Sequence, residues 1–338
     1  MSKDVAAIFE QAFAALEDGE TEQATASLEA VKKAGVAIDD PRYLHLQGLI
    51  AWAEGEVDDA AMLLEQAVDA GPSDSRIYLD AGELLADLDE LDAAEGVFRR
   101  LLAREDLAIE TRGEALMLLA QVRLDHFDSD PEEALELLDQ VDATLQQEPS
   151  YISLRSAALL HKGDVDQAIA LLEQALERED DVEIRYQLGL ACRGHGREEQ
   201  GTAALLLVRE HDLRESGGDS TTPIPNDEIE DLRRRTEDVI DTLPDPILTL
   251  VAAGPIRVQR WIDEVHVRAG VDPRSAVAFE GTPASKEDSG DGVLSGIVVF
   301  RDVLVDQIDD DDDIADALAL GLLEELSRFF KLENLELG

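Results

Sequence analysis

The sequence predicts an all-α solenoid of stacked helical hairpins over residues 5–213, followed by a small α+β domain. Three observations support this fold class. A pattern of apolar residues recurs about every 34 residues through the first two thirds of the chain, glycines recur in step with it, and after residue 226 short β-branched runs replace the repeat. Aromatic residues make up only 4% of the chain while Ala and Leu are abundant, which favours helix packed on helix.

The repeating unit is a triplet: a small residue, a large apolar residue four positions later, and another apolar residue three after that. Spacings of four and three place all three side chains on one face of a helix, so each triplet predicts the buried side of a helix. The triplets are Ala24-Leu28-Val31, Ala60-Leu64-Ala67, Ala94-Phe98-Leu101, Ala134-Leu138-Val141, Ala168-Leu172-Ala175 and Gly201-Leu205-Val208.

Two sets of glycines keep a fixed phase with the triplets. The first set lies five residues before the small residue, where positive φ ends the first helix of a hairpin: Gly19, Gly55, Gly163 and Gly196. The second set lies seven residues before the turn position, where the missing side chain lets two helices approach closely: Gly48, Gly82 and Gly189. Asp89 stands at the turn position of the third repeat, and the fourth repeat has a stretched turn from Phe127 to Pro131.

These residues resemble the tetratricopeptide repeat. Residues 41–72 carry its pattern at Gly48, Gly55, Ala60, Ala67 and Pro72. Residues 186–210 match at Leu188, Gly189, Gly196 and Leu205, and depart at Gly201, where the family prefers alanine. The resemblance covers about 210 residues and implies six hairpins whose first helices line a groove for another protein or peptide.

From the register of that family, the groove residues are Arg42, His45, Trp52, Arg76, Glu83, Tyr186 and Arg193. Trp52 and Tyr186 offer flat contact area to a peptide, although either can instead pack between hairpins. The paired Lys and Asn residues with which one subtype clamps C-terminal carboxylates are missing at the matching places, which disfavours that ligand class. The sequence therefore predicts a protein-binding adaptor.

A linker and a second domain follow the repeats. Residues 214–226 are rich in glycine, hydroxyl residues and proline, as in a linker, and residues 227–338 form the second domain. Its predicted elements are a helix from Asn226 or Asp227 to about Leu243, strands at Val265–Val267, Val277–Phe279 and Gly296–Phe300, and a last helix from about Ile314 to Phe330.

The second domain resembles the small bacterial zincin-like metallopeptidases. The resemblance rests on the order of its elements, on the closing helix, and on Pro244, Pro273, Phe279, Glu280 and Gly281. In that family the last helix carries H-E-x-x-H followed by x-x-G-x-x-D. The two histidines bind zinc and the glutamate activates water.

The zinc ligands of that motif are absent here. Glu324 stands at the first histidine, Arg328 at the second and Asn334 at the third ligand, and only Glu325 matches, at the catalytic glutamate. A guanidinium cannot ligate a cation, so we expect a non-catalytic domain without metal or cofactor, with a Glu324–Arg328 ion pair in the metal's place. Two alternatives stay open: a metallopeptidase with an atypical metal site, and a purely structural domain that covers the solenoid's end.

The charge limits the partners. The formal net charge of −48 disfavours nucleic acid and anionic membrane surfaces, so another protein or peptide is expected. The acidity fits either a basic partner or adaptation to salt, while the groove arginines leave an acidic ligand group open. Two acidic segments, Lys286–Gly292 and Asp309–Asp313, lack the spacing of a calcium loop.

The cysteine count and the first residues bear on the compartment. Cys192 is the only cysteine, which rules out a disulfide within the chain, and its place in the last hairpin predicts a core position. Residues 1–4 are followed by an acidic amphipathic pattern rather than by a signal peptide. We therefore expect a cytoplasmic protein.

Overall fold

The computed structural model describes residues 3–217, 223–251, 254–284, 292–308 and 313–332. The chain divides into two compact units, Met1–Ala175 (unit 1) and Leu176–Gly338 (unit 2). The last helical hairpin therefore belongs to the same unit as the α+β part. Within the described residues, no helix has the length and apolar character that crossing a membrane requires.

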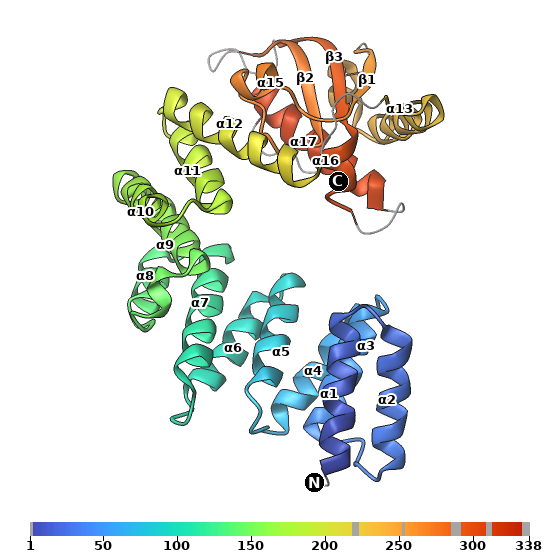
Figure 1. Ribbon diagram of the computed structural model, residues 1–338, viewed down its shortest axis with the longest axis vertical. Coiled ribbons are helices and arrows are strands. Elements are labelled where there is room, and N and C mark those ends of the chain that lie inside the picture. Colours follow the sequence, from blue (N-terminus) through green and yellow to red (C-terminus); the bar gives the residue numbers. More distant parts are fainter. Residues whose placement is uncertain (1–2, 218–222, 252–253, 285–291, 309–312, 333–338) are drawn as a thin grey trace. The chain divides into compact units, whose positions relative to one another are not determined.

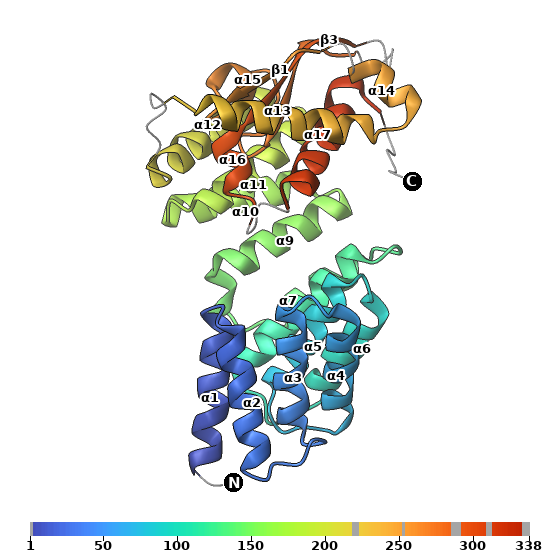
Figure 2. The same cartoon turned by 90° about the vertical axis from the view of Figure 1, so that its right-hand side faces the viewer.

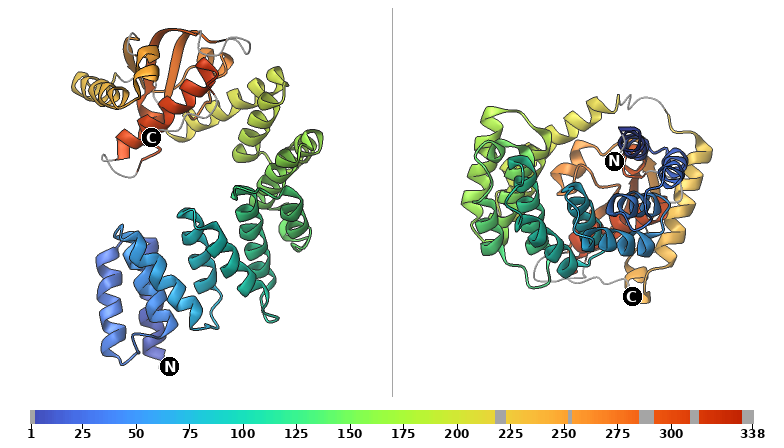
Figure 3. Two further views of the ribbon diagram at one scale, coloured as in Figure 1. Left: turned by 180° about the vertical axis from the view of Figure 1, so that it is seen from behind. Right: turned by 90° about the horizontal axis from the view of Figure 1, so that it is seen from below.

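Unit 1 is built of helical hairpins that follow one another along the chain (Figures 1 and 3). Its helices are α1 (Lys3–Glu17), α2 (Thr21–Lys33), α3 (Pro41–Ala53), α4 (Val57–Asp69), α5 (Arg76–Asp87), α6 (Leu91–Leu102), α7 (Ile109–Asp125), α8 (Pro131–Leu138) and α9 (Pro149–Lys162), with a short 3₁₀ turn η1 (Leu145–Gln147) before α9. Helix α10 (Val165–Arg178) begins in unit 1 and ends in unit 2. The first helices also pack on one another, α1 on α3, α3 on α5 and α5 on α7.

The triplet residues form the core between helices, as the period predicts, except that Ala175 is partly exposed. Leu64, Phe98, Leu138 and Leu172 are each 0% exposed. A single hairpin cannot bury its own apolar face, so the second helices α2, α4, α6 and α8 also pack on the first helix of the next hairpin. The predicted register is confirmed. Cys192 is also fully buried, as expected.

The crossing-point glycines explain why the helices of a hairpin come so close. A Cβ on Gly82 would lie 2.4 Å from the Phe98 ring, and one on Gly48 would lie 2.9 Å from the Leu64 side chain. A close approach also explains why a glycine stands at position 201, where the repeat family prefers alanine. A Cβ there would lie 2.7 Å from the Gly189 carbonyl oxygen, so in the last hairpin the two helices cross glycine to glycine.

The turns behave as the sequence predicts. Gly55 has a φ of 80° and Gly163 a φ of 88°, in the left-handed region that glycine enters without steric cost. Asp89 takes the same conformation with a φ of 60°, so an aspartate replaces the glycine of the third repeat without changing the turn.

Unit 2 joins the last hairpin to a small mixed sheet (Figure 2). Its elements after α10 are α11 (Val182–Gly194), α12 (Glu198–Glu215), α13 (Asn226–Asp241), α14 (Asp245–Val251), β1 (Ile256–Gln259), α15 (Glu264–Arg268), β2 (Val277–Thr282), β3 (Val293–Phe300), α16 (Arg301–Val305) and α17 (Ile314–Phe330). The strand order is β1-β3-β2, with β1 parallel and β2 antiparallel to β3.

The prediction of individual elements in unit 2 was partly wrong. The strands at 277 and 296 and the helices at 226 and 314 are confirmed. Val265–Val267 is not a strand but lies in α15, because the Asp263 carboxylate caps this helix by accepting from the His266 backbone N–H at 3.1 Å. Strand β1 was not predicted. The acidic segment 309–312 and most of 286–292 lie outside the described residues.

Both faces of the sheet are covered within unit 2. Side chains alternate across a strand, so Phe279, Ile297 and Val299 pack with α13 and α17, whereas Ala278, Val298 and Phe300 form a second cluster. Leu205 of α12 belongs to this second cluster, together with Ile262 and Val267. Helix α12 thus packs both on α11, its partner in the hairpin, and on the sheet.

Candidate protein-interaction site

The first helices of unit 1 carry a connected set of side chains on one side, which we call the first-helix face. It comprises Phe9 and Phe13 on α1, Arg42, His45 and Trp52 on α3, Arg76, Asp80 and Glu83 on α5, and Glu114 on α7. Their spacings of three, four or seven residues place those of one helix on the same side. This set contains five of the seven residues predicted for the groove.

Aromatic and ionic contacts link these helices. The guanidinium of Arg42 lies 5.4 Å from the Phe9 ring centroid, and that of Arg76 lies 5.4 Å from the Phe13 centroid. The His45 Nε2 atom lies 2.6 Å from Asp80 Oδ2. His45 is only 1% exposed, which corrects the expectation that it faces a ligand: it holds α3 to α5.

The charge of Arg42 is already neutralised within the chain. Its Nε donates to Asp40 Oδ1 at 3.0 Å and its Nη2 donates to Asp40 Oδ2 at 2.6 Å. The hydrogen bonds from Arg42 lower the pKa of Asp40, and those to Asp40 raise the pKa of Arg42. A bidentate pair of this kind leaves Arg42 poorly suited to capture an acidic ligand.

The carboxylates at the centre of the face, Glu83 and Glu114, have raised pKa values, whereas the pKa of Asp40 is lowered. Glu83 and Glu114 both reach the surface, but neighbouring atoms remove part of their hydration. This partial desolvation, and then repulsion from Asp80, Glu114 and Asp87, raises the pKa of Glu83. Burial and Asp80 raise the pKa of Glu114. Among the residues that the structure describes, no cationic side chain contributes to either pKa shift. A cation placed between these carboxylates would relieve the repulsion.

Trp52 supplies apolar contact area on the same side of α3. It stands two helical turns beyond His45, and it is 42% exposed. An exposed indole is suited to anchor a protein segment. Of the seven predicted groove residues, Arg42, Trp52, Arg76 and Glu83 therefore lie on this face with their side chains at the surface.

Tyr186 and Arg193 have a different role from the one predicted, because both hold the last hairpin to the α+β part inside unit 2. Arg193 donates through Nη1 to the carbonyl oxygens of Gly270 and Val271, at 3.0 and 3.1 Å, and through Nη2 to that of Val267 at 2.9 Å. The Tyr186 hydroxyl donates to Asp272 Oδ2 at 2.8 Å, and burial raises its pKa. Both side chains are thus engaged within the chain.

The motif positions on α17 do not fit a zinc ion. The Glu325 side chain is 2% exposed, and its Oε2 accepts from the Phe279 backbone N–H and from Arg328 Nη2, both at 2.7 Å. Its Oε1 accepts from Arg328 Nε. A carboxylate held in this way cannot activate water, and the guanidinium excludes a cation.

The predicted Glu324–Arg328 pair is therefore wrong, since Arg328 pairs with Glu325 three residues earlier. Both side chains lie on the inner side of α17, whereas Glu324 faces outward. Asn334 lies outside the described residues. Within the described part of the chain, no group of three or more His, Cys, Asp or Glu side chains is arranged to hold a metal.

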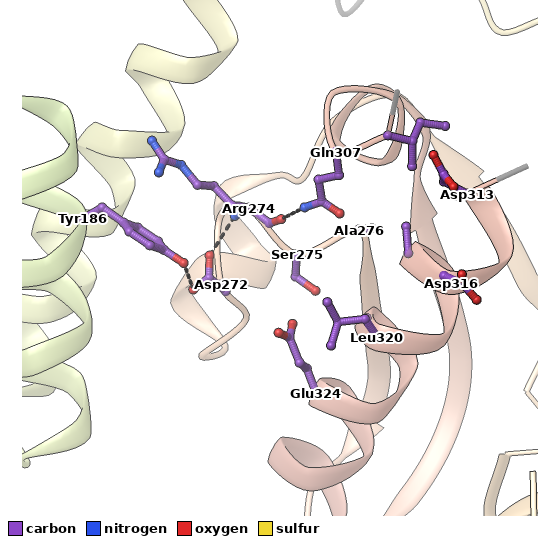
Figure 4. Close-up of a pocket in the computed structure, with 13 residues that line it drawn as sticks. Tyr186, Asp272, Arg274, Ser275, Ala276, Gln307, Asp313, Asp316, Leu320 and Glu324 are labelled. Carbon is purple, nitrogen blue, oxygen red and sulfur yellow. Dashed lines mark hydrogen bonds between the residues drawn. The ribbon is translucent and has the colours of Figure 1, made fainter. Parts of the chain in front are cut away.

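Glu324 borders a cavity of about 680 Å³ in unit 2 (Figure 4). The cavity lies between Tyr186 of α11, the segment Asp272–Ala276, the residues Gln307 and Ile308, and the outward side of α17. Burial, and then the charges of Asp272 and Glu325, raises the pKa of Glu324. Sequence reasoning missed this cavity because its walls are far apart in the chain.

Hairpins that repeat with this period and cross at glycine define the helical part as a helical-repeat solenoid. More specifically, the family model of the tetratricopeptide repeat matches residues 9–75, 45–107 and 156–211, so these residues are similar to that repeat. Tetratricopeptide proteins generally act as protein-interaction scaffolds. A comparison of the sequence with curated proteins found no match.

Solved structures share the fold of the helical part. PilW, described as a widely conserved type IV pilus biogenesis factor, aligns with a TM-score of 0.53 at 14% identity, over 62% of this chain and 94% of PilW. PilF of Pseudomonas aeruginosa aligns with a TM-score of 0.51 at 14% identity, over 61% of this chain and 90% of PilF. At these identities the likeness concerns the fold alone.

Proposed function

We propose that this protein is an adaptor that binds a basic segment of another protein on the first-helix face of unit 1. The observation that carries the proposal is the placement of two exposed carboxylates, Glu83 and Glu114, on the neighbouring first helices α5 and α7, and the raised pKa values of both agree with their mutual crowding. A lysine or arginine of the partner would supply the missing charge.

The two arginines of the face support this choice of partner over an acidic one. Arg42 is neutralised by Asp40, and Arg76 lies over Phe13. The formal net charge of −48 adds long-range attraction for a basic partner and argues against nucleic acid and anionic membranes. With its one cysteine buried, the chain is suited to a reducing compartment, and we propose the cytoplasm.

For the α+β part we propose a non-catalytic, zincin-like domain. The support is the pair Glu325–Arg328, which occupies the centre of the motif, together with the packing of α12 on the sheet. A metallopeptidase with an atypical metal site would need Glu325 to leave its three hydrogen bonds. One bound zinc per chain, with peptide hydrolysis lost in a Glu325→Gln variant, would establish that alternative instead.

The binding proposal is tested with charge-matched variants. The double variant Glu83→Gln/Glu114→Gln removes two charges from the face, and Glu22→Gln/Glu65→Gln removes two exposed charges from the second helices α2 and α4. Partners captured by the wild-type protein are identified, and their affinities are measured for both variants. We expect the first variant to bind about tenfold more weakly, equivalent to about 1.4 kcal/mol, and the second to bind like the wild type. Equal affinities for all three proteins would refute the proposal.

A further inference from the structure

The cavity beside Glu324 has two kinds of wall. On one side, α17 presents Asp316, Leu320 and Glu324, at spacings of four residues and therefore in one row. On the other side stand Tyr186 and Arg274 (Figure 4). Its volume of about 680 Å³ lies within the range of ordinary ligand pockets.

The single arginine of the cavity is held in place by other residues. Arg274 donates through Nη1 and Nη2 to Glu183 at 2.8 and 2.7 Å, and through Nε to Asp212 at 2.9 Å. Its guanidinium also lies 4.6 Å from the Tyr186 ring centroid. Arg274 is thus a fixed part of the wall. Its charge is neutralised by Glu183 and Asp212, and not by the carboxylates of α17.

Asp272 is satisfied as well. Its Oδ2 accepts from the Tyr186 hydroxyl at 2.8 Å, and its Oδ1 accepts from the Arg274 backbone N–H at 2.8 Å. Its negative charge nevertheless acts on Glu324, whose pKa rises without a cationic contribution from the described residues. Excess negative charge therefore faces the cavity from both walls.

Between the carboxylates lies an apolar strip. Leu320 is 61% exposed, and Ala317 and Ile308 add further apolar side chains to the cavity lining. A carboxylate at the end of an aliphatic strip, as Glu324 is beside Leu320, matches a long side chain that carries a cation on an apolar stem. Among protein side chains only lysine and arginine have this form.

We propose that this cavity binds a lysine or arginine side chain of a partner protein, with the stem on Leu320 and the cation at Glu324, where the charge of Asp272 also acts. The charge complementarity and the exposed leucine argue for this occupant. The site lies wholly in unit 2 and does not depend on the first-helix face, so either can fail without the other.

The test uses the full chain with labelled leucine methyl groups, followed by NMR. The probe is the peptide acetyl-Ala-Gly-Lys-Gly-Ala-amide, and its control carries norleucine, which keeps the stem without the charge. We expect the lysine peptide to shift the Leu320 methyl signals and to bind at least five-fold more tightly than the norleucine peptide. Glu324→Gln should weaken the lysine peptide at least three-fold, whereas Glu237→Gln on α13 should leave its affinity unchanged.

Any of three results would overturn the proposal. These are equal binding of the two peptides, unchanged affinity in Glu324→Gln, and shifts that spare Leu320. A free polyamine serves as a further arm, since spermidine carries the same cation without a peptide. If spermidine shifts the Leu320 signals and the lysine peptide does not, the occupant is not a protein side chain and the proposal fails.

Discussion

At the scale of single residues, small side chains set how closely the helices approach. The sequence was sufficient to predict Gly48, Gly82 and Gly189 as crossing points, because they keep a fixed phase with the triplets. It did not reveal that Gly113 has the same role. A Cβ on Gly113 would lie 2.3 Å from the Leu145 side chain, which belongs to η1 and stands outside the triplet pattern.

Two glycines of one hairpin allow a matched test of this role. Gly82→Ala places a Cβ 2.4 Å from the Phe98 ring, so we expect a loss of about 1–3 kcal/mol in the free energy of unfolding. Gly96 lies in α6 with nothing within 4 Å of an added Cβ, so Gly96→Ala should stabilise by up to about 1 kcal/mol. Denaturant unfolding of both variants measures the difference. Equal effects of the two substitutions would show that the crossing is not tight.

At the scale of elements, the second packing role of α12 was not predictable from the repeat. The triplet Gly201-Leu205-Val208 correctly predicts the side that is buried, but it does not show that Leu205 also packs with Ile262, Val267 and the sheet. Local periodicity reports which side of a helix is buried, and not which distant element covers it. The run Leu205-Leu206-Leu207 was an available signal, since it makes the apolar side of α12 wider than one partner needs.

The double role of α12 predicts which fragments fold. Residues 180–338 contain the last hairpin and should unfold cooperatively, whereas residues 223–338 leave the second face of the sheet bare and should aggregate. In the longer fragment, Leu205→Ala should cost about 2–5 kcal/mol. Thermal unfolding followed by circular dichroism, with size-exclusion chromatography, distinguishes the outcomes. Cooperative unfolding of the shorter fragment with equal stability would contradict the assignment of α12 to the α+β core.

At the scale of the whole molecule, the acidity has two possible meanings that composition alone cannot separate. A formal net charge of −48 keeps a protein soluble wherever the charges lie. The positions of Glu83 and Glu114 are more informative, because partial desolvation and like charges work against the ionisation of these two surface carboxylates. The sequence predicted the place of Glu83 from the repeat register, and Asp80 lies one turn earlier on the same helix. The proximity of Glu114 became visible only when α5 and α7 were brought together.

The central claim, that a cation of the partner binds between these carboxylates, is tested most directly by the pH dependence of affinity. Because the pKa values of Glu83 and Glu114 are raised, these two groups take up protons before ordinary glutamates as the pH falls. Binding of a cation requires the ionised form of the two glutamates, while lysine and arginine stay charged throughout.

Isothermal titration calorimetry of the partner's basic segment between about pH 7 and about pH 5 measures the effect. We expect the wild-type protein to lose affinity over this range and the Glu83→Gln/Glu114→Gln variant to bind weakly at both ends with little change. Equal affinity and an equal pH dependence in the two proteins would contradict the account.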